Sequence, residues 1–491
     1  MNGVVAAGHP LTADAGAQIL RAGGNAVDAA LAAMAVSFVA EPQLTGLGAG
    51  GFMLVAEPGE APALLDFFVS TSGIGADPAR RAPLVAAEVF FGTVAQEFHV
   101  GPSSCGVYGT PAGMCEAHRR YATMPLAELV ARGARHAREG VQVNAQQAYI
   151  FHLLAPLFEA SDEAREKYWI GDRVAREGDV LSNPELATTL ERLAAEGAAP
   201  FYGGDIAEAA VARVSAGGGT LTLEDLAAYE ATPREPIQVG YRGHDVFTNP
   251  PPSAGGILIA YVLALLEREP APPSQVRLVG AMEAAQRART PEFLEGLARP
   301  GFLDEFMGSQ LGSTTHISVL DGEGRACAVT CTNGEGSGVF VPGTGIHLNN
   351  MMGEEDLSPL GFFTHPRGRR LPSMMAPTVV LDDGSPELVL GSAGSNRIRS
   401  AVLQVIVNAI DHGMDAQAAV DAPRLHFEDN LIYAEPGVDL APLIAQRQAV
   451  ERFRDRNLFF GGVQAVLRDP ATGLLSGAAD PRRGGSAVIV R

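Results

Sequence analysis

Apolar residues recur at helical spacing along the first forty residues of the chain. Over Leu11–Arg21 they fall three and four positions apart, which predicts a helix that ends at Gly23-Gly24. Asn25 is then a good N-cap for the run Ala26–Val39, in which nearly every position is apolar. A helix that is apolar on every side has no face for water, so we expect this second helix to be buried.

Short apolar runs between glycines and prolines predict core strands in the next part of the chain. These runs are Phe52–Ala56 and Ala63–Val69. Met124–Arg138 has the pattern of an amphipathic helix, and residues 150–235 are mainly helical in pattern, with Thr222 as the N-cap of a further helix. The first half of the chain is therefore expected to mix helices with strands.

The pattern changes twice in the second half. Three consecutive prolines, Pro250 to Pro252, exclude regular structure, and the apolar helix Ile257–Glu267 follows them. The stretch Pro270–Gly312 has charges, prolines and glycines with weak periodicity, so we expect a surface linker or mobile segment. After it, Thr315–Leu320 and Ala326–Thr332 are predicted to be strands joined by a hairpin turn.

Composition narrows the class of protein. With 491 residues, 46% of them hydrophobic and 19% charged, the chain can hold one large layered domain or two to three average ones. The formal charge of −20 disfavours nucleic acid and anionic membranes as partners. The N-terminal sequence lacks the basic and apolar regions of a signal peptide, and no long apolar span occurs elsewhere. We therefore expect a soluble, cytoplasmic enzyme.

Several common chemistries find no support in the motifs. The glycine run Gly46–Gly51 matches G-x-G-x-x-G, but a polar turn precedes it and a strand follows, which disfavours nucleotide binding. The metalloprotease and α/β-hydrolase motifs are absent, and the histidines form no spaced ligand pair, so neither metal nor cofactor is expected. No C-x-x-C pair occurs, and we expect reduced structural thiols at Cys105, Cys115, Cys327 and Cys331.

The most informative segment is Gly312–Val319. It places hydroxyl residues after the unpatterned stretch and at the start of a core strand. If the Ser313–Thr314 bond were cut, Thr314 would have both a nucleophilic hydroxyl and a free α-amine with a pKa near 8, which can act as its general base. The alternative is that Ser-Thr-Thr only begins a β-branched strand.

Ordered sequence blocks decide between these interpretations. They are His9-Pro10-Leu11, Arg21 to Ala29, Glu41 to Phe52, Pro251 to Gly256, Ser313 to His316, Pro342 to Asn350, Pro372-Ser373-Met374, Gly391 to Arg397 and Asp480 to Arg483. In these blocks the chain resembles the γ-glutamyltransferase family of N-terminal-nucleophile hydrolases over nearly its whole length. The resemblance implies a mixed α/β (α+β) fold, a four-layer αββα sandwich. It also implies a proenzyme cleaved into a large subunit, 1–313, and a small subunit, 314–491, which together form one domain.

The resemblance also implies roles for particular residues. Thr314 corresponds to the nucleophile, first for self-cleavage through an N-to-O acyl shift at Ser313 and then for attack on a substrate amide. Thr332 matches the threonine whose hydroxyl supports that nucleophile. Gly394 and Ser395 match the positions whose backbone N–H groups bind the tetrahedral oxyanion.

Three further positions resemble the family's contacts to the amino-acid head of a γ-glutamyl group. Glu354 stands where the family usually has an aspartate, so a carboxylate for an α-ammonium is retained. Ser373 follows Pro372 where the family usually has a second serine, so one hydroxyl is lost. Asn333 is the third, and the loop after Thr332 is about two residues shorter than is usual in the family.

Phe68 is the most consequential departure from the family. It replaces the arginine that clamps the substrate's α-carboxylate, and phenylalanine can make no charged, bidentate pair. A carboxylate buried without a partner is costly, so we expect a changed acyl donor with an apolar group at this place. The alternative is compensation by a nearby arginine such as Arg397 or Arg399.

Three hypotheses follow. The first is a self-cleaving amide hydrolase or acyltransferase with altered donor specificity, acting on a small-molecule amide or γ-glutamyl-like substrate with water or an amine as acceptor. The second is an orthodox γ-glutamyltransferase that acts on glutathione. The third is a catalytically silent member of the family that never matures.

Overall fold

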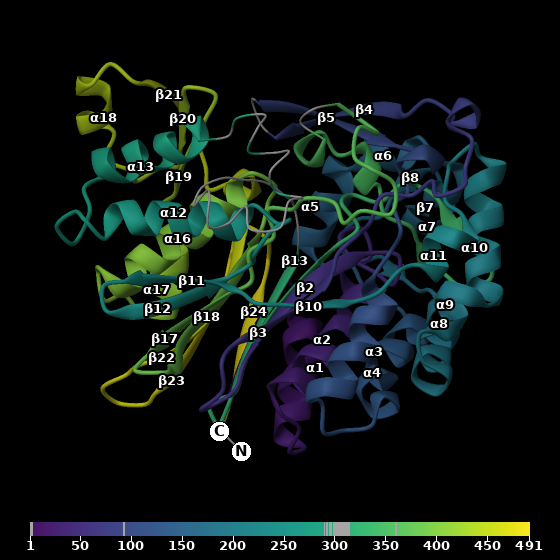
Figure 1. Ribbon diagram of the computed structural model, residues 1–491, viewed down its shortest axis with the longest axis horizontal. Helices are drawn as coiled ribbons and strands as arrows, with labels where there is room; N and C mark the ends of the chain where they lie inside the picture. The colour runs from purple at the N-terminus through teal and green to yellow at the C-terminus, as the bar shows by residue number, and fades with distance from the viewer. Residues whose placement is uncertain are drawn as a thin grey trace.

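Helices and strands of the computed structural model form four layers, with two β-sheets face to face between two layers of helices (Figure 1). The structure describes residues 3–91, 94–288, 290, 293, 297, 315–358 and 361–491. All strand pairs within the two main sheets are antiparallel. The αββα sandwich expected from the sequence is therefore confirmed.

The first sheet contains the strands around the predicted cleavage site. Its order is β10 (Thr232–Arg234), β3 (Ala63–Phe67), β2 (Gly50–Ala56), β14 (Ala326–Thr332), β13 (Thr315–Asp321), β1 (Gly3–Ala7) and β24 (Ser486–Val490). Because β1 pairs with β24, the two ends of the chain lie side by side (Figure 1).

The second sheet packs against the inner face of the first. Its order is β11 (Ile237–Tyr241), β12 (His244–Thr248), β17 (Thr378–Asp382), β18 (Ser385–Ala393), β22 (Gly462–Arg468) and β23 (Leu475–Ala479). Apolar side chains of both sheets fill the space between them, among them Phe52, Leu54, Phe68, Val379 and Val389. The central strands β17, β18 and β22 are buried at most positions on both faces, as core strands of a layered domain must be, whereas β11 and β12 have exposed positions.

The helices outside the first sheet follow the predicted N-terminal pattern. All fifteen residues of α2 (Ala26–Ala40) are buried, and Asn25 forms a capping box with Asp28 at its start. The helices packed in or around this layer are α1 (Pro10–Arg21), α3 (Thr110–Tyr121), α4 (Leu126–Glu139) and α8 (Pro184–Glu196). The buried second helix expected from the sequence is therefore confirmed.

The region predicted to be mainly helical extends this side of the molecule. It contains α5 (Ala145–Leu153), α6 (Ala155–Glu159), α7 (Asp162–Tyr168), α9 (Ala199–Gly203), α10 (Asp205–Ala216) and α11 (Leu223–Ala227). Thr222 caps α11 in a capping box with Asp225, as predicted. Short strands outside the main sheets are β4 (Val85–Phe91), β5 (Val94–Val100), β6 (Val141–Gln142), β7 (Trp169–Ile170), β8 (Arg173–Val174), β9 (Val180–Leu181), β15 (Phe340–Val341) and β16 (Ile346–His347).

The helices outside the second sheet include one that the sequence pattern did not predict. They are α12 (Gly255–Leu266), α13 (Gln275–Arg287), α16 (Arg397–Ile410) and α17 (Ala416–Asp421). α13 lies within the stretch interpreted as a linker, and that interpretation is wrong for this part. Its buried face, Leu278, Val279 and Met282, packs into the same core as α12, while its charged residues face solvent. The far edge carries β19 (Leu425–Glu428), β20 (Leu431–Ala434), α18 (Ala441–Ala445) and β21 (Ala449–Arg452).

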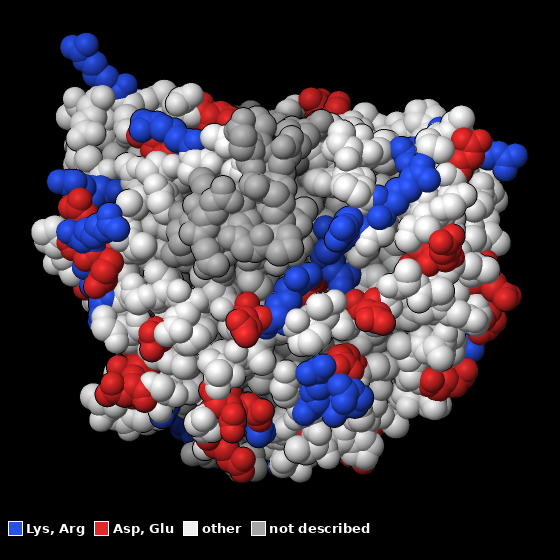
Figure 2. Space-filling view, in the orientation of Figure 1, with Lys and Arg blue, Asp and Glu red and all other residues white. Residues whose placement is uncertain are grey.

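The four cysteines lie in the hydrophobic core or pack against it. All four cysteines are free, with Cys105, Cys327 and Cys331 buried and Cys115 half-buried. Lysine and arginine gather in a diagonal band across the face in Figure 2, so the acidic excess of the chain is unevenly spread there. In the described part of the chain, every helix is too short or too polar to cross a membrane.

Candidate active site

The predicted cleavage bond lies directly before a central strand of the first sheet. Ser313 and Thr314 are outside the described residues, but Thr315, the next residue, begins β13 and is buried. Its antiparallel partner is Cys331 in β14. Consecutive Cα atoms are about 3.8 Å apart, so the predicted nucleophile is tied to the place where β13 begins and β14 ends.

Thr332 ends β14 at this same place. Its side chain is buried, and its hydroxyl oxygen accepts a hydrogen bond from the Gly334 N–H at 2.8 Å. The acceptor role leaves the hydroxyl proton available to a further partner. The register that pairs Thr315 with Cys331 puts Thr332 beside the start of β13, where a hydroxyl supporting the nucleophile is predicted.

Glu41, which the sequence analysis did not single out as a site residue, touches the residue after the nucleophile. The Thr315 hydroxyl donates to Glu41 Oε1 at 3.2 Å, and the Thr12 hydroxyl donates to Oε2 at 3.5 Å. Burial raises the pKa of Glu41 to about 7, against the opposing effect of these hydrogen bonds. A carboxyl group that titrates near neutral pH therefore lies next to the predicted reaction centre.

The predicted oxyanion donors lie at a tight turn between β18 and α16. Gly394 has φ +124°, and a Cβ there would stand 2.7 Å from the Gly461 backbone, so the position requires glycine. Ser395 has φ +54°, a left-handed conformation that is rare for serine. Its hydroxyl donates to Asp356, and Asn396 Nδ2 donates to the same carboxylate at 3.0 Å. Asp356 thus holds the turn in place.

Two acidic side chains lie together near the end of β14. Glu354 is buried and accepts from Asn350 Nδ2 at 3.2 Å, and its carboxyl group lies next to that of Glu335. Burial raises the pKa of both groups, and the charge of Glu335 raises that of Glu354 further. Two enclosed carboxyl groups this close ionise one after the other, so the pair suits a single bound cation.

Asn333 is the third residue predicted to contact the amino-acid head of the substrate. Its side chain is fully buried, and Nδ2 donates to the His347 carbonyl at 3.3 Å. Its Oδ1 is enclosed without a hydrogen-bond partner among the described residues. A buried carbonyl oxygen without a partner is costly, which points to an external donor such as an ammonium group. Asn350 joins Asn333 to Glu354, because its N–H donates to the Asn333 carbonyl and its Nδ2 donates to Glu354, and the substrate contacts of Asn333 and Glu354 stay predictions.

Ser373 is buried beside the proline turn. Its hydroxyl accepts from the Met375 N–H at 3.1 Å, and its carbonyl accepts from the Ser253 hydroxyl at 2.8 Å and from the Ala254 N–H at 2.7 Å. Among the described residues no hydrogen bond joins Ser373 to Asn333 or Glu354. Ser373 is therefore tied to the proline turn, and its substrate contact stays a prediction.

Phe68 lies directly after β3 and faces the core between the sheets. Its side chain is 1% exposed and stacks on Phe52 with ring centroids 5.4 Å apart. Its backbone carbonyl accepts from the Tyr229 hydroxyl at 2.7 Å and from Arg370 at 2.6 Å. Position 68, to which the sequence resemblance assigns the family arginine, is thus occupied by a packed aromatic ring.

The arginines considered as replacements are engaged elsewhere. Arg397 donates to the Phe459 carbonyl at 3.1 Å and lies over the Phe459 ring, and Arg399 donates to Gln286 at 2.7 Å. Arg370, beside Phe68, pairs with the buried Asp66 at 3.1 Å. Each of these three guanidinium groups has at least one partner within the protein, and compensation by Arg397 or Arg399 stays the alternative.

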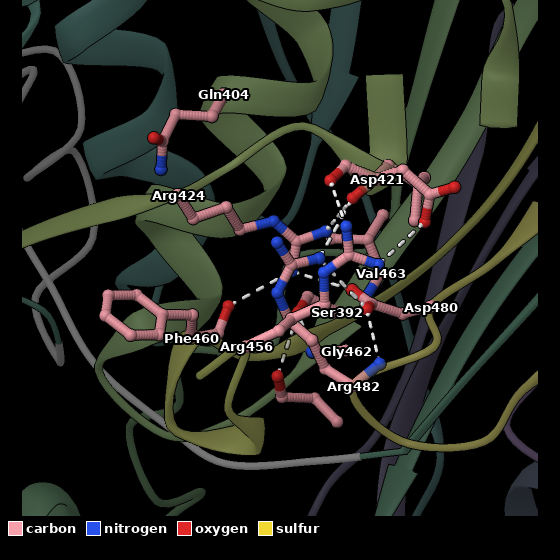
Figure 3. A network of polar contacts seen from close by, with 12 residues as sticks. Ser392, Gln404, Asp421, Arg424, Arg456, Phe460, Gly462, Val463, Asp480 and Arg482 are labelled. Atoms are coloured by element: carbon pink, nitrogen blue, oxygen red, sulfur yellow. Dashed lines mark hydrogen bonds and ion pairs between the residues drawn. The ribbon is translucent and has the colours of Figure 1, made fainter. Parts of the chain in front are cut away.

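A buried ionic network fixes the last sequence block of the chain (Figure 3). Asp480 pairs with Arg424 at 2.7 Å and with Arg482 at 3.1 Å, and accepts from the Val463 N–H at 2.9 Å. Arg482 also pairs with Glu435. The burial cost of these charges is offset because each has partners, so the chain from residue 480 to 482 is held rigidly beside β22.

Possible metal ligands gather at two other places among the described residues. One group is Glu97, His99 and Glu355, and the other is His244, Asp382 and Glu387. Neither contains a residue predicted for the active site. The expectation that the chemistry needs no metal or cofactor stays a prediction.

Comparison with known proteins identifies the family to which the chain belongs. The gamma-glutamyltranspeptidase family model matches residues 12–293 and 304–490. A glutathione hydrolase proenzyme of Escherichia coli K12 is 31% identical, with 98% of this chain and 90% of the relative covered. An acylase ACY 1 proenzyme of Pseudomonas sp. SE83 is also 31% identical, with coverages of 99% and 93%. The crystal structure of cephalosporin acylase from Bacillus halodurans superimposes with a TM-score of 0.79 at 28% identity, covering 99% of this chain and 95% of that one. The chain is an enzyme that belongs to the gamma-glutamyltranspeptidase family.

Proposed function

We propose that the chain is a proenzyme that cuts itself between Ser313 and Thr314 and then uses Thr314 to hydrolyse or transfer the acyl group of a small-molecule amide. One observation carries this most directly. Thr315 begins a central strand beside the buried hydroxyl of Thr332 and the carboxyl group of Glu41. The proenzyme names of the relatives support it.

Self-cleavage needs no group beyond the chain and water. The Thr314 hydroxyl attacks the Ser313 carbonyl carbon, the peptide C–N bond breaks, and the acyl group moves from nitrogen to oxygen. Water then hydrolyses the ester, which leaves a carboxylate at Ser313 and a free amine at Thr314. The Thr332 hydroxyl is placed to orient the attacking oxygen.

The mature enzyme repeats this chemistry on its substrate. The Thr314 amine takes the hydroxyl proton as the oxygen attacks the amide carbonyl, and later gives that proton to the leaving amine. The backbone N–H groups of Gly394 and Ser395 bind the oxyanion, which typically contributes about 3–4 kcal/mol to the transition state. Water or an amine acceptor then releases the acyl group from the threonine ester.

The donor specificity is part of the proposal. The ring of Phe68 is packed against Phe52, and the Arg370 guanidinium beside it is paired with Asp66, so we expect no unpaired guanidinium for an α-carboxylate at position 68. A donor that differs from γ-glutamyl in its acid group fits this arrangement. The alternative, an orthodox glutathione-hydrolysing γ-glutamyltransferase, draws support from Asn333 and the Glu335–Glu354 pair, which suit an α-ammonium group.

Four p-nitroanilides separate these possibilities. γ-Glutamyl has both the ammonium and the carboxylate, glutaryl has only the carboxylate, 4-aminobutyryl has only the ammonium, and butyryl has neither. We expect γ-glutamyl to be a poor donor relative to at least one of the others. Fastest release of p-nitroaniline from γ-glutamyl would support the orthodox enzyme, and no release from any donor by cleaved protein would support the silent relative.

A further inference from the structure

Arg483 is a half-buried cation whose guanidinium lacks a partner among the described residues. Its Nε is enclosed without a hydrogen-bond acceptor, and the structure shows no ion pair or hydrogen bond of its guanidinium with any described residue. Burial lowers the pKa of Arg483 to about 10, and the nearby charge of Arg397 acts in the same direction. Enclosing the Nε of a guanidinium without an acceptor is unfavourable, so a negatively charged ligand would be stabilised at this position.

The position of Arg483 ties it to the predicted reaction centre from three sides. Its Nη2 stands 3.6 Å from the place that a Cβ would occupy on Gly394, at the predicted oxyanion turn. Glu41, which holds Thr315, and Glu335, of the acidic pair, lie near enough to influence its charge. Burial raises the pKa of both carboxyl groups, which limits how far they can neutralise Arg483.

The adjacent residue, Arg482, has a structural role in this segment. Arg482 pairs with Glu435 and Asp480 and donates to the carbonyls of Val420 and Ala422 (Figure 3). Its network fixes the backbone that carries Arg483. The side chain of Arg483 then passes over Gly462, where any Cβ would collide with it. Arg482 therefore has several ion-pair and hydrogen-bond partners, whereas the guanidinium of Arg483 has none among the described residues.

We propose that Arg483 binds a carboxylate of the acyl donor and takes the place of the arginine that is missing at position 68. The inference rests on the proposed function, and it names the donor class: amides whose acyl group carries a carboxylate a few bonds from the scissile carbonyl. The planar guanidinium can hold such a carboxylate through two parallel hydrogen bonds. Because Arg483 reaches the site beside Gly394, the acid group lies next to the predicted oxyanion turn.

Matched donors and variants test the proposal. Succinyl and glutaryl p-nitroanilides carry the acid, and butyryl p-nitroanilide lacks it. Arg483→Met removes the charge at similar length, Arg483→Lys keeps a point charge, and Arg454→Met removes an exposed charge as the control. Intact mass spectrometry first establishes that each variant is cleaved like the wild type.

We expect Arg483→Met to lower kcat/KM at least about 30-fold on the acid donors and less than about threefold on butyryl, with Arg483→Lys in between and Arg454→Met unchanged. An equal loss on acid and neutral donors would overturn the proposal. So would a lowered melting temperature with an unchanged acid preference, which would reveal a purely structural partner.

A binding measurement keeps this inference separable from the proposed function. Glutarate is titrated calorimetrically into wild-type, Arg483→Met and Arg483→Lys protein. We expect binding to the wild type that is lost in Arg483→Met and weakened in Arg483→Lys. Such binding would support the carboxylate site even if no amide were hydrolysed, whereas equal binding to all three proteins, or to none, would contradict it.

Discussion

Glu41 is buried beside the residue that follows the predicted nucleophile, and its replacement by glutamine has a calculable effect on stability. Burial raises its pKa from 4.5 to about 7. Between these pH values the folded chain retains a proton that the unfolded chain has released. The stability from this proton is fully present below about pH 4.5 and is lost as the pH rises through 7.

The shift fixes the size of the effect. About 2.5 pKa units at 1.36 kcal/mol each give about 3 kcal/mol, of which about 2.5 kcal/mol is lost between pH 5 and pH 8.5. With an unfolding entropy of about 2.1 cal/mol/K per residue, a chain of 491 residues changes its melting temperature by about 1 °C per kcal/mol. Glu41→Gln keeps an acceptor for Thr315 and cannot ionise, so it should escape this loss.

The assay is thermal unfolding at pH 5 and pH 8.5. Thr314→Ala serves as the background, because we expect it to remain one uncut chain. Relative to that background, Glu41→Gln should gain about 2–3 °C in melting temperature at pH 8.5 compared with pH 5. Glu60→Gln, at an exposed glutamate, is the control and should show no such gain. If the melting temperature changed equally with pH in the Glu41→Gln protein and in its background, the raised pKa of Glu41 would not be the cause, and the prediction would be wrong.

Three further substitutions test other parts of the account. Thr332→Val should slow self-cleavage about 10- to 100-fold in a mass-spectrometric time course, since it leaves a buried N–H without its acceptor, and Thr332→Ser should restore the rate. Phe68→Arg should raise kcat/KM on γ-glutamyl p-nitroanilide while it lowers the melting temperature by several degrees, because the side chain is buried; no gain would mean that other pocket residues also exclude this donor. Arg424→Met should lower the melting temperature by about 3–5 °C, because it removes a buried partner of Asp480; an unchanged value would show that the network adds no stability.

Local signals in the sequence predicted the elements that position the site. Asn25 and Thr222 form the capping boxes expected from their places before apolar runs, and the strands on either side of the hairpin turn lie where alternation and β-branched residues put them. The failure at α13 has a physical cause. Its charged residues obscure the helical spacing of its few apolar residues. The helix is stabilised by the packing of those apolar residues against α12, which the local sequence does not show.

The parts of the site that sequence reasoning missed depend on contacts between distant segments. Glu41 and Thr315 are 274 positions apart in the chain and meet because α2, whose C-cap is Glu41, packs against β13, which begins at Thr315. Arg483 differs from Arg482 only in its surroundings, which no local pattern records. Glu335 lies two residues after Asn333 in the shortened loop, and an acidic residue at that place was the one signal available in advance.

The proposed chemistry requires that Thr314 become a free N-terminal nucleophile. The first measurement is therefore an intact mass, recorded under denaturing conditions on freshly purified protein. We expect two fragments, residues 1–313 and 314–491, from the wild-type chain and a single uncut mass for Thr314→Ala. A full-length mass of the wild-type chain that persists through long incubation, or fragments that meet at any other bond, would contradict it.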